Sequence, residues 1–160
     1  SDILPDGSLD YDEKTLARFD FIIAAVHSNF NIPANEMTAR LKKALQNKYT
    51  SILVHPTGRL LLSREPYAVN MEEIIDTAAK SSKAIELNAN AHRLDLDWRN
   101  CIYAKRKGVK ISINPDAHQI AGLHDISFGI KIARKGWLSK EDCLNCMELE
   151  EVKKYLRNKK

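Results

Sequence analysis

Four short apolar runs, separated by segments with helical periodicity, restrict the fold of this 160-residue chain more than any other feature. They cover residues 21–26, 51–54, 84–87 and 109–113. The first two are continuous runs of Ile, Val, Leu and Ala, which is typical of parallel strands covered on both faces. Residues 109–113 alternate instead, so we expect one face of that strand to meet a more polar environment. A shorter run at Ile3 and Leu4 is consistent with the tail of another strand.

Helical patterns fill the intervals between these runs. They cover residues 35–47, 71–81, 97–107, 122–134, 140–147 and 149–157. Asn70 is placed to cap the start of the second helix, and Gly108 to cap the end of the third. Strands and helices that alternate at this spacing indicate right-handed βαβ units in an α/β fold, and do not separate an open sheet from a barrel.

Composition and length indicate one soluble domain. The hydrophobic share is 44% and the charged share 29%, which is ordinary for a globular protein with its own core. No apolar run reaches the roughly 18 residues of a membrane helix, and no signal peptide opens the chain, so no membrane partner is expected. The odd number of cysteines, three, favours a reducing cytoplasm. Cys143 and Cys146 form a C-x-x-C without a second pair, which favours buried thiols over a redox or zinc site.

The net charge of +4 is concentrated near the end of the chain. The basic residues there are Lys153, Lys154, Arg157, Lys159 and Lys160. Two interpretations stay open: a solvated helix face or frayed end, and a surface that contacts a phosphate backbone.

Histidines follow three of the four predicted strands. His27 comes directly after the first and His55 directly after the second, while Asp116 and His118 come after the fourth. The carboxyl ends of parallel strands share one rim, where α/β proteins place their chemistry. We therefore expect these four side chains to converge.

Imidazole nitrogens combined with a carboxylate oxygen suit divalent Zn, Mn or Fe, whereas an all-oxygen set would suit Mg or Ca. A single histidine after a strand is most often a turn residue, but three such histidines with an Asp-x-His among them predict a shared metal site. His92 and His124 are interpreted as surface or supporting groups rather than ligands.

Several motifs resemble, in order, those of the PHP (polymerase and histidinol phosphatase) domain. They are Ala-Val-His-Ser-Asn at 25–29, His-Pro-Thr-Gly-Arg-Leu-Leu at 55–61, Glu-Leu-Asn-Ala-Asn at 86–90 and Ile-Asn-Pro-Asp-Ala-His at 113–118. Segments 58–61, 93–96 and 133–138, with the Cys-Leu-Asn that begins at Cys143, resemble the version carried by bacterial and archaeal family X DNA polymerases.

This resemblance implies a distorted seven-stranded β/α (TIM-like) barrel with up to three metal ions at its C-terminal rim. It also implies metal-dependent phosphoester hydrolysis, associated in family X polymerases with 3′-5′ exonuclease and 3′-end processing of DNA in repair. Carried over by motif, His27, His55, Asp116 and His118 match metal-ligand positions. Pro115 stands where the family usually has Thr, beside two retained ligands.

The family's domain begins with a His-x-His motif, a further histidine and a glutamate ligand, and the glutamate would fall just before Ser1. Residues 1–160 are therefore expected to be the C-terminal part of a PHP domain, without the polymerase domains of the parent chain. We expect such a part to bind divalent metal weakly, to show little or no nuclease activity, and to pair through its open barrel edge.

Two arginines are predicted to bind phosphate. Arg59 ends the turn after His55 and can present a planar guanidinium, although a salt bridge that holds the loop is an equal alternative. Arg93 is the second candidate. Two other functions stay open: a small-molecule phosphatase of the histidinol-phosphatase type, and a non-catalytic module that engages DNA.

Overall fold

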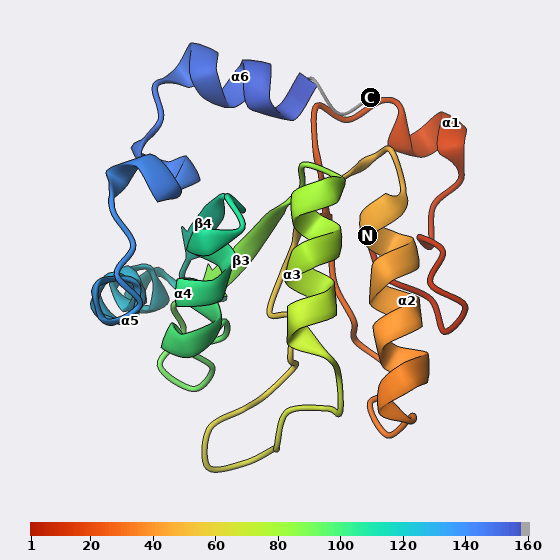
Figure 1. Ribbon diagram of the computed structural model, residues 1–160, viewed down its shortest axis with the longest axis horizontal. Coiled ribbons are helices and arrows are strands. Elements are labelled where there is room, and N and C mark those ends of the chain that lie inside the picture. Colours follow the sequence, from red (N-terminus) through yellow and green to blue (C-terminus); the bar gives the residue numbers. More distant parts are fainter. Residues whose placement is uncertain (158–160) are drawn as a thin grey trace.

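The computed structural model describes residues 1–157 and contains a four-stranded parallel sheet in the order β1-β2-β3-β4 (Figure 1). The strands are β1 (Ile22–Ala24), β2 (Thr50–Leu53), β3 (Ala84–Asn88) and β4 (Ile111–Asn114). Each pairs with the next one in the chain, in parallel. The predicted α/β class is therefore confirmed, and each end of the four predicted strands lies within two residues of the end found. The sheet described within residues 1–157 has four strands, so the predicted seven-stranded barrel is not shown and stays a prediction.

Three helices cover one face of the sheet and lie side by side in Figure 1. They are α2 (Ala34–Gln46), α3 (Met71–Lys80) and α4 (Trp98–Arg106). Asn70 caps α3 as predicted, since its side chain accepts a hydrogen bond from the Glu73 amide at 3.2 Å. Gly108, after α4, has a φ of +72°, which favours glycine. Apolar side chains of the three helices, such as Leu41 and Ile75, form the main core with the sheet.

The opposite face of the sheet carries a smaller apolar cluster. It contains Ile52 of β2 and Val54, which directly follows β2, and Leu144 and Tyr155 pack there from the end of the chain. Tyr155 is part of α6 (Leu149–Arg157), the helix that Figure 1 shows at the far end from the long loop after β2. Because successive side chains of a strand point to opposite faces, β2 and β3 contribute to both clusters: Leu53 and Ile85 lie in the main core, and Ile52 and Ala84 in the smaller cluster.

An additional segment runs beside β1. Asp2 forms a parallel bridge with Ala25, and Ile3 is buried, so the predicted strand tail is present as an isolated pairing. The buried Arg40 of α2 donates hydrogen bonds to the carbonyls of Leu4 and Ser28, which holds this segment against the sheet. A short helix, α1 (Glu13–Leu16), follows it and was not predicted.

The prediction of one helix over 140–147 is wrong. The structure has two three-residue 3-10 segments, η2 (Lys140–Asp142) and η3 (Leu144–Cys146). Between them Cys143 is extended and bridges in parallel to Ile111, on the outer edge of β4. Pairing with the sheet edge interrupts the helical backbone there.

Two further expectations need correction. The helix predicted over 122–134 begins as a 3-10 turn, η1 (Ile120–Asp125), and becomes α-helical only in α5 (Ile126–Lys135). Full cover on both faces holds for β2, whose four residues are buried, but not for β1, where Ile23 is 40% exposed.

Lys159 and Lys160, part of the predicted basic end, lie outside the described residues. Within 1–157, no helix is both long and apolar enough to cross a membrane.

Candidate active site

A cavity of about 730 Å³ lies on the sheet face opposite α2, α3 and α4. Its apolar end is formed by side chains of β1, β2 and α6, among them Ile23, Ile52 and Leu156. Its polar end is formed by residues at the carboxyl ends of the strands. These are His27, His55, Glu86, Ser112, Asn114, Asp116 and His118. All four predicted metal ligands therefore line one cavity.

His27 and His55 lie next to each other, with ring centroids 5.2 Å apart. The exposed His27 pairs through Nδ1 with Asp2 Oδ1 at 2.7 Å, so the segment beside β1 also contributes to this end of the cavity. His55 is only 6% exposed, and its buried Nδ1 has no hydrogen-bond partner among the described residues. A buried ring nitrogen without a partner is available to a ligand.

Asp116 and His118 come from the loop after β4. Asp116 Oδ2 accepts hydrogen bonds from Asn88 Nδ2 and Arg93 Nε, both at 3.1 Å. His118 Nδ1 lies 2.8 Å from the Asp116 carbonyl oxygen, which fixes the ring relative to its neighbour. His55 and Asp116 both have positive φ, +31° and +51°. Such backbone strain in non-glycine residues is concentrated at functional sites.

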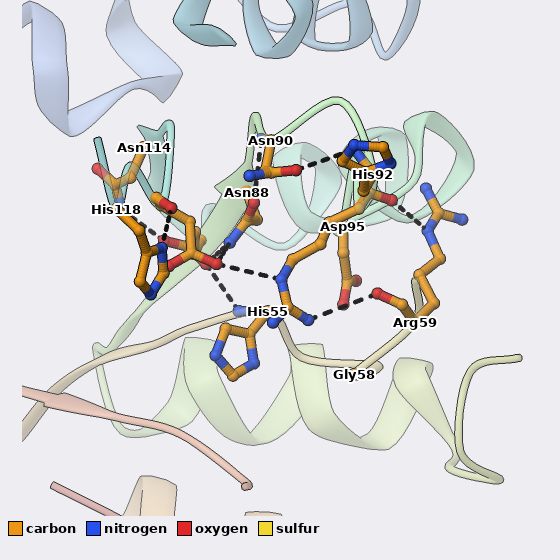
Figure 2. A network of polar contacts seen from close by, with 12 residues as sticks. His55, Gly58, Arg59, Asn88, Asn90, His92, Asp95, Asn114 and His118 are labelled. Atoms are coloured by element: carbon orange, nitrogen blue, oxygen red, sulfur yellow. Dashed lines mark hydrogen bonds and ion pairs between the residues drawn. The ribbon is translucent and has the colours of Figure 1, made fainter. Parts of the chain in front are cut away.

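Glu86 of β3 connects these groups and was not predicted as a site residue. It is buried, and its Oε2 accepts hydrogen bonds from the His55 amide at 2.7 Å and from Asn88 Nδ2 at 3.1 Å. Its Oε1 accepts from Asn114 Nδ2 at 2.9 Å. The carboxylate thus ties the ends of β2, β3 and β4 together, and Asn88 links it to Asp116. Figure 2 shows Asn88, Asn114 and His55 within this network of polar contacts.

Burial shifts the pKa of two groups in this network in opposite directions. It raises the pKa of Glu86 to about 7, because the charged carboxylate is separated from water. Burial, together with the charges of Arg93 and His27, lowers the pKa of His55 to about 4. His55 is therefore neutral at neutral pH, which is the form of imidazole that binds metals.

The two predicted phosphate-binding arginines hold the loops beside the cavity. Arg59 donates through Nε to the Arg93 carbonyl at 2.7 Å and through Nη2 to the Leu94 carbonyl. The loop-holding alternative is therefore present for Arg59, through carbonyl groups rather than a salt bridge. Arg93 pairs with Asp116 and keeps its side chain 17% exposed. Phosphate binding by either arginine stays a prediction.

Behind these loops the buried Asp95 accepts a hydrogen bond from the Thr57 amide at 2.9 Å, and burial raises its pKa to about 6. His92 lies on the loop after β3, near Asp116, and His124 is exposed in η1. Neither lines the cavity. Cys143 is buried and Cys146 exposed, and neither is in a disulfide in the part of the chain that the structure describes.

The donor chemistry of the cavity fits a divalent transition metal, since it combines imidazole nitrogens, one of them unpartnered, with a carboxylate. The side chains are not preassembled as a coordination sphere. Within residues 1–157 no three His, Cys, Asp or Glu side chains are gathered closely enough to hold a metal ion. The four predicted ligands thus share a cavity but do not form a closed cluster.

Together these features define a class: parallel α/β proteins with a polar, histidine-lined cavity at the carboxyl ends of their strands. Sequence comparisons make the assignment narrower, although no protein-family profile matches the chain. The chain is 45% identical over 156 residues, 98% of its own length, to the DNA polymerase/3′-5′ exonuclease PolX of Bacillus subtilis. It is 26% identical over 97% of its length to a probable phosphatase of a Thermoanaerobacter species. It is 32% identical over 71% of its length to a probable phosphatase of Caldicellulosiruptor saccharolyticus.

These matches confirm the resemblance to the family X polymerase branch: the chain is related to a segment of PolX. It spans 27% of the PolX protein, and 64% and 48% of the two probable phosphatases.

Proposed function

We propose that this chain belongs to a metal-dependent phosphoesterase, and that its substrate is DNA, cut at a 3′ end in a repair setting. One observation carries the proposal: His27, His55, Asp116 and His118, separated in the sequence, line a single cavity at the strand ends. The similarity to PolX, whose name includes a 3′-5′ exonuclease, supports the choice of DNA.

In this proposal the cavity holds divalent Mn, Zn or Fe through His27, His55, Asp116 and His118. When bound, such a metal lowers the pKa of a coordinated water and offsets negative charge on the phosphate oxygens. The contacts of Asp116 with Asn88 and Arg93 both use Oδ2, so Oδ1 would be its ligand atom for the ion. The Arg93 guanidinium beside it would pair with a phosphate oxygen, while Glu86 and Asn88 keep the strand ends in register.

A small-molecule phosphoester is the second candidate substrate. The names of the more distant relatives, probable phosphatases, favour it. These relatives match the chain at lower identity than PolX does, over 97% and 71% of its length. A non-catalytic DNA-engaging module is the third candidate function, and the predicted basic end of the chain is its main support.

The domain assignment is also part of the proposal. We propose that residues 1–160 form the C-terminal part of a PHP domain, that the sheet continues as a seven-stranded barrel in the whole protein, and that polymerase domains belong to the same chain. The dispersed donors within 1–157 support weak metal binding by this chain alone, with little or no nuclease activity. Pairing with a second copy through the open barrel edge is also part of the proposal. We also propose a cytoplasmic location, which agrees with a phosphoesterase that acts on DNA.

Binding of Mn²⁺ to the 160-residue chain, measured by isothermal titration calorimetry, tests the site. Asp116→Ala should weaken binding by about ten-fold or more, because it removes the carboxylate ligand. Asp20→Ala, at an exposed aspartate outside the polar end, is the matched control. Equal affinity in the parent and Asp116→Ala would exclude the proposed metal site.

Hydrolysis distinguishes the substrates. A protein extended to the full length of its PolX-like relatives should release nucleotides from a 3′-labelled single-stranded oligodeoxynucleotide faster than it cleaves p-nitrophenyl phosphate, both in Mn²⁺. The opposite order would support the small-molecule phosphatase. Robust Mn²⁺-dependent nucleotide release by the 160-residue chain itself, abolished by Asp116→Ala, would contradict its expected inactivity.

A further inference from the structure

A second hollow, of about 360 Å³, adjoins the central cavity and shares Asp116 and His118 with it. Its other lining residues are Leu60, Leu61, Ser63, Asn90, His92 and Arg93. Its size falls within the range of small-ligand sites. A ligand whose phosphate is held by Arg93 and a metal at Asp116 could therefore extend from one hollow into the other.

Two loops form this second hollow, and hydrogen bonds hold them together. The Leu61 amide donates to the His92 carbonyl at 2.6 Å, and Arg59 Nε donates to the Arg93 carbonyl at 2.7 Å. The first loop is also closed on itself, because the Leu60 amide donates to the Arg64 carbonyl at 2.8 Å. The hollow is thus held in shape by hydrogen bonds between the loops after β2 and β3.

The walls of the hollow combine apolar area with hydrogen-bonding edges. Leu60 and Leu61 supply the apolar part, and Leu61 is 36% exposed. Asn90 and His92 supply amide and imidazole groups, and the His92 ring has no hydrogen-bond partner in the described part of the chain. Nucleobases combine a flat apolar face with a polar edge, and they stack on imidazole and aliphatic surfaces.

We propose that this hollow is a nucleobase subsite. It binds the base of the nucleotide whose phosphate would be held by Arg93 and the metal at Asp116, so that the ligand is single-stranded DNA rather than a small phosphoester. The inference rests on the proposed function, which supplies the phosphate position, and adds to it the residues that select a nucleotide. Arg93 lines the second hollow and contacts Asp116, which lines both hollows, so its positive charge lies near the proposed phosphate position.

Fluorescence anisotropy with two fluorescein-labelled probes, in Mn²⁺ buffer, tests the subsite on the 160-residue chain. One probe is an oligodeoxythymidylate, and the other is an abasic deoxyribose-phosphate chain of the same length. Leu61→Ala and His92→Ala should each weaken oligodeoxythymidylate binding about five-fold, since losing a base contact costs at least about 1 kcal/mol. Their affinity for the abasic chain should be unchanged.

Two matched substitutions serve as controls. Leu4→Ala removes a leucine of similar exposure, 39%, and His124→Ala removes an exposed histidine, and neither residue lines either hollow. Both should bind the two probes as the parent does. Variants that weaken both probes equally, or neither, overturn the subsite, as does a parent that binds the two probes with equal affinity. In that last case phosphate binding still stands, whereas a parent that binds neither probe contradicts the proposed function as well.

Discussion

The two faces of the sheet use the same strands for different purposes. On the face toward α2, α3 and α4, the side chains are apolar and packed, as with Leu53, Ile85 and Ile111. On the opposite face, apolar residues such as Ile52 give way at the strand ends to Glu86 and the residues of the cavity. One face therefore holds the fold together, while the other arranges polar groups around a space.

This difference predicts that residues important for folding stability and residues important for ligand binding lie on different faces of the sheet. Substitutions on the helix-covered face should unfold the protein without a specific effect on ligands. Substitutions at the strand ends of the open face should change ligand binding or pH dependence more than they change stability. Comparing matched residues on the two faces tests this separation directly.

The largest expected effect belongs to the packed face. Leu41 of α2 is completely buried, and Leu41→Ala should lower the free energy of unfolding by about 2–5 kcal/mol, through lost burial and a cavity. Ile23→Ala, on the open face, should cost less than about 1.5 kcal/mol because Ile23 is already 40% exposed. Urea denaturation followed by circular dichroism measures both. Equal losses would mean that the open face is as tightly packed as the other.

The packed face is also the part that the sequence predicts well. Helical spacing beginning at Met37 and the cap at Asn70 locate α2 and α3 to within a residue, because burial against the sheet follows the local period. The segment at 140–147 fails for the opposite reason. There a contact far along the chain, the bridge between Cys143 and Ile111, overrides a helical local pattern.

The second prediction concerns pH. Glu86→Gln removes a buried ionisable group. A carboxyl whose pKa rises on folding, here from 4.5 to about 7, contributes its stability in full below pH 4.5 and loses it as the pH increases through about 7. The parent should therefore lose roughly 3 kcal/mol relative to Glu86→Gln between pH 4.5 and 8. Urea titrations of both proteins in chelator measure this difference.

Glutamine is a suitable replacement because the network can adapt to it. Its carbonyl can keep accepting from the His55 amide and Asn88, while its NH₂ group faces Asn114. Asn114 can turn its amide, and Ser112, which now donates to Asn114 Oδ1, can accept instead. The shifted groups Asp95 and His55 are common to both proteins and cancel in the comparison. A difference that stays constant with pH would show that Glu86 keeps an ordinary pKa.

The third prediction separates positioning from packing. Asn88 is fully buried and links Glu86 to Asp116, so Asn88→Ala should weaken Mn²⁺ binding about ten-fold by releasing the carboxylate ligand. Asn145→Ala is the matched control, since Asn145 lines the same cavity and, among residues 1–157, its side chain bonds only to the backbone of Ile113. Both variants should lose about 1–2 kcal/mol of stability. Calorimetry that shows equal Mn²⁺ affinities would contradict the positioning role.

The strand-end histidines and Asp116 could be predicted from the sequence because the rule that parallel strands end at one rim is general. Glu86 was missed, although it left a signal: Glu86 and Asn88 are two residues apart in an apolar run, hence on one face of β3. The pairing of Arg93 with Asp116 left none, since it joins two loops whose separation depends on the assembled sheet.

The smallest expected effect is at the rim of the open face. Leu62 is fully exposed and has a φ of +64°, a conformation that favours Gly or Asn over leucine. Leu62→Asn should therefore raise the free energy of unfolding by about 0.5–1 kcal/mol, since it relieves strain and gives up no buried area. Leu4→Asn, at a leucine without positive φ, should bring no gain. Because Leu62 lines neither hollow, probe and Mn²⁺ affinities should stay at the parent's values. A loss of stability in Leu62→Asn would instead show that this leucine is covered by another surface in solution, and that the rim belongs with the packed regions of the protein.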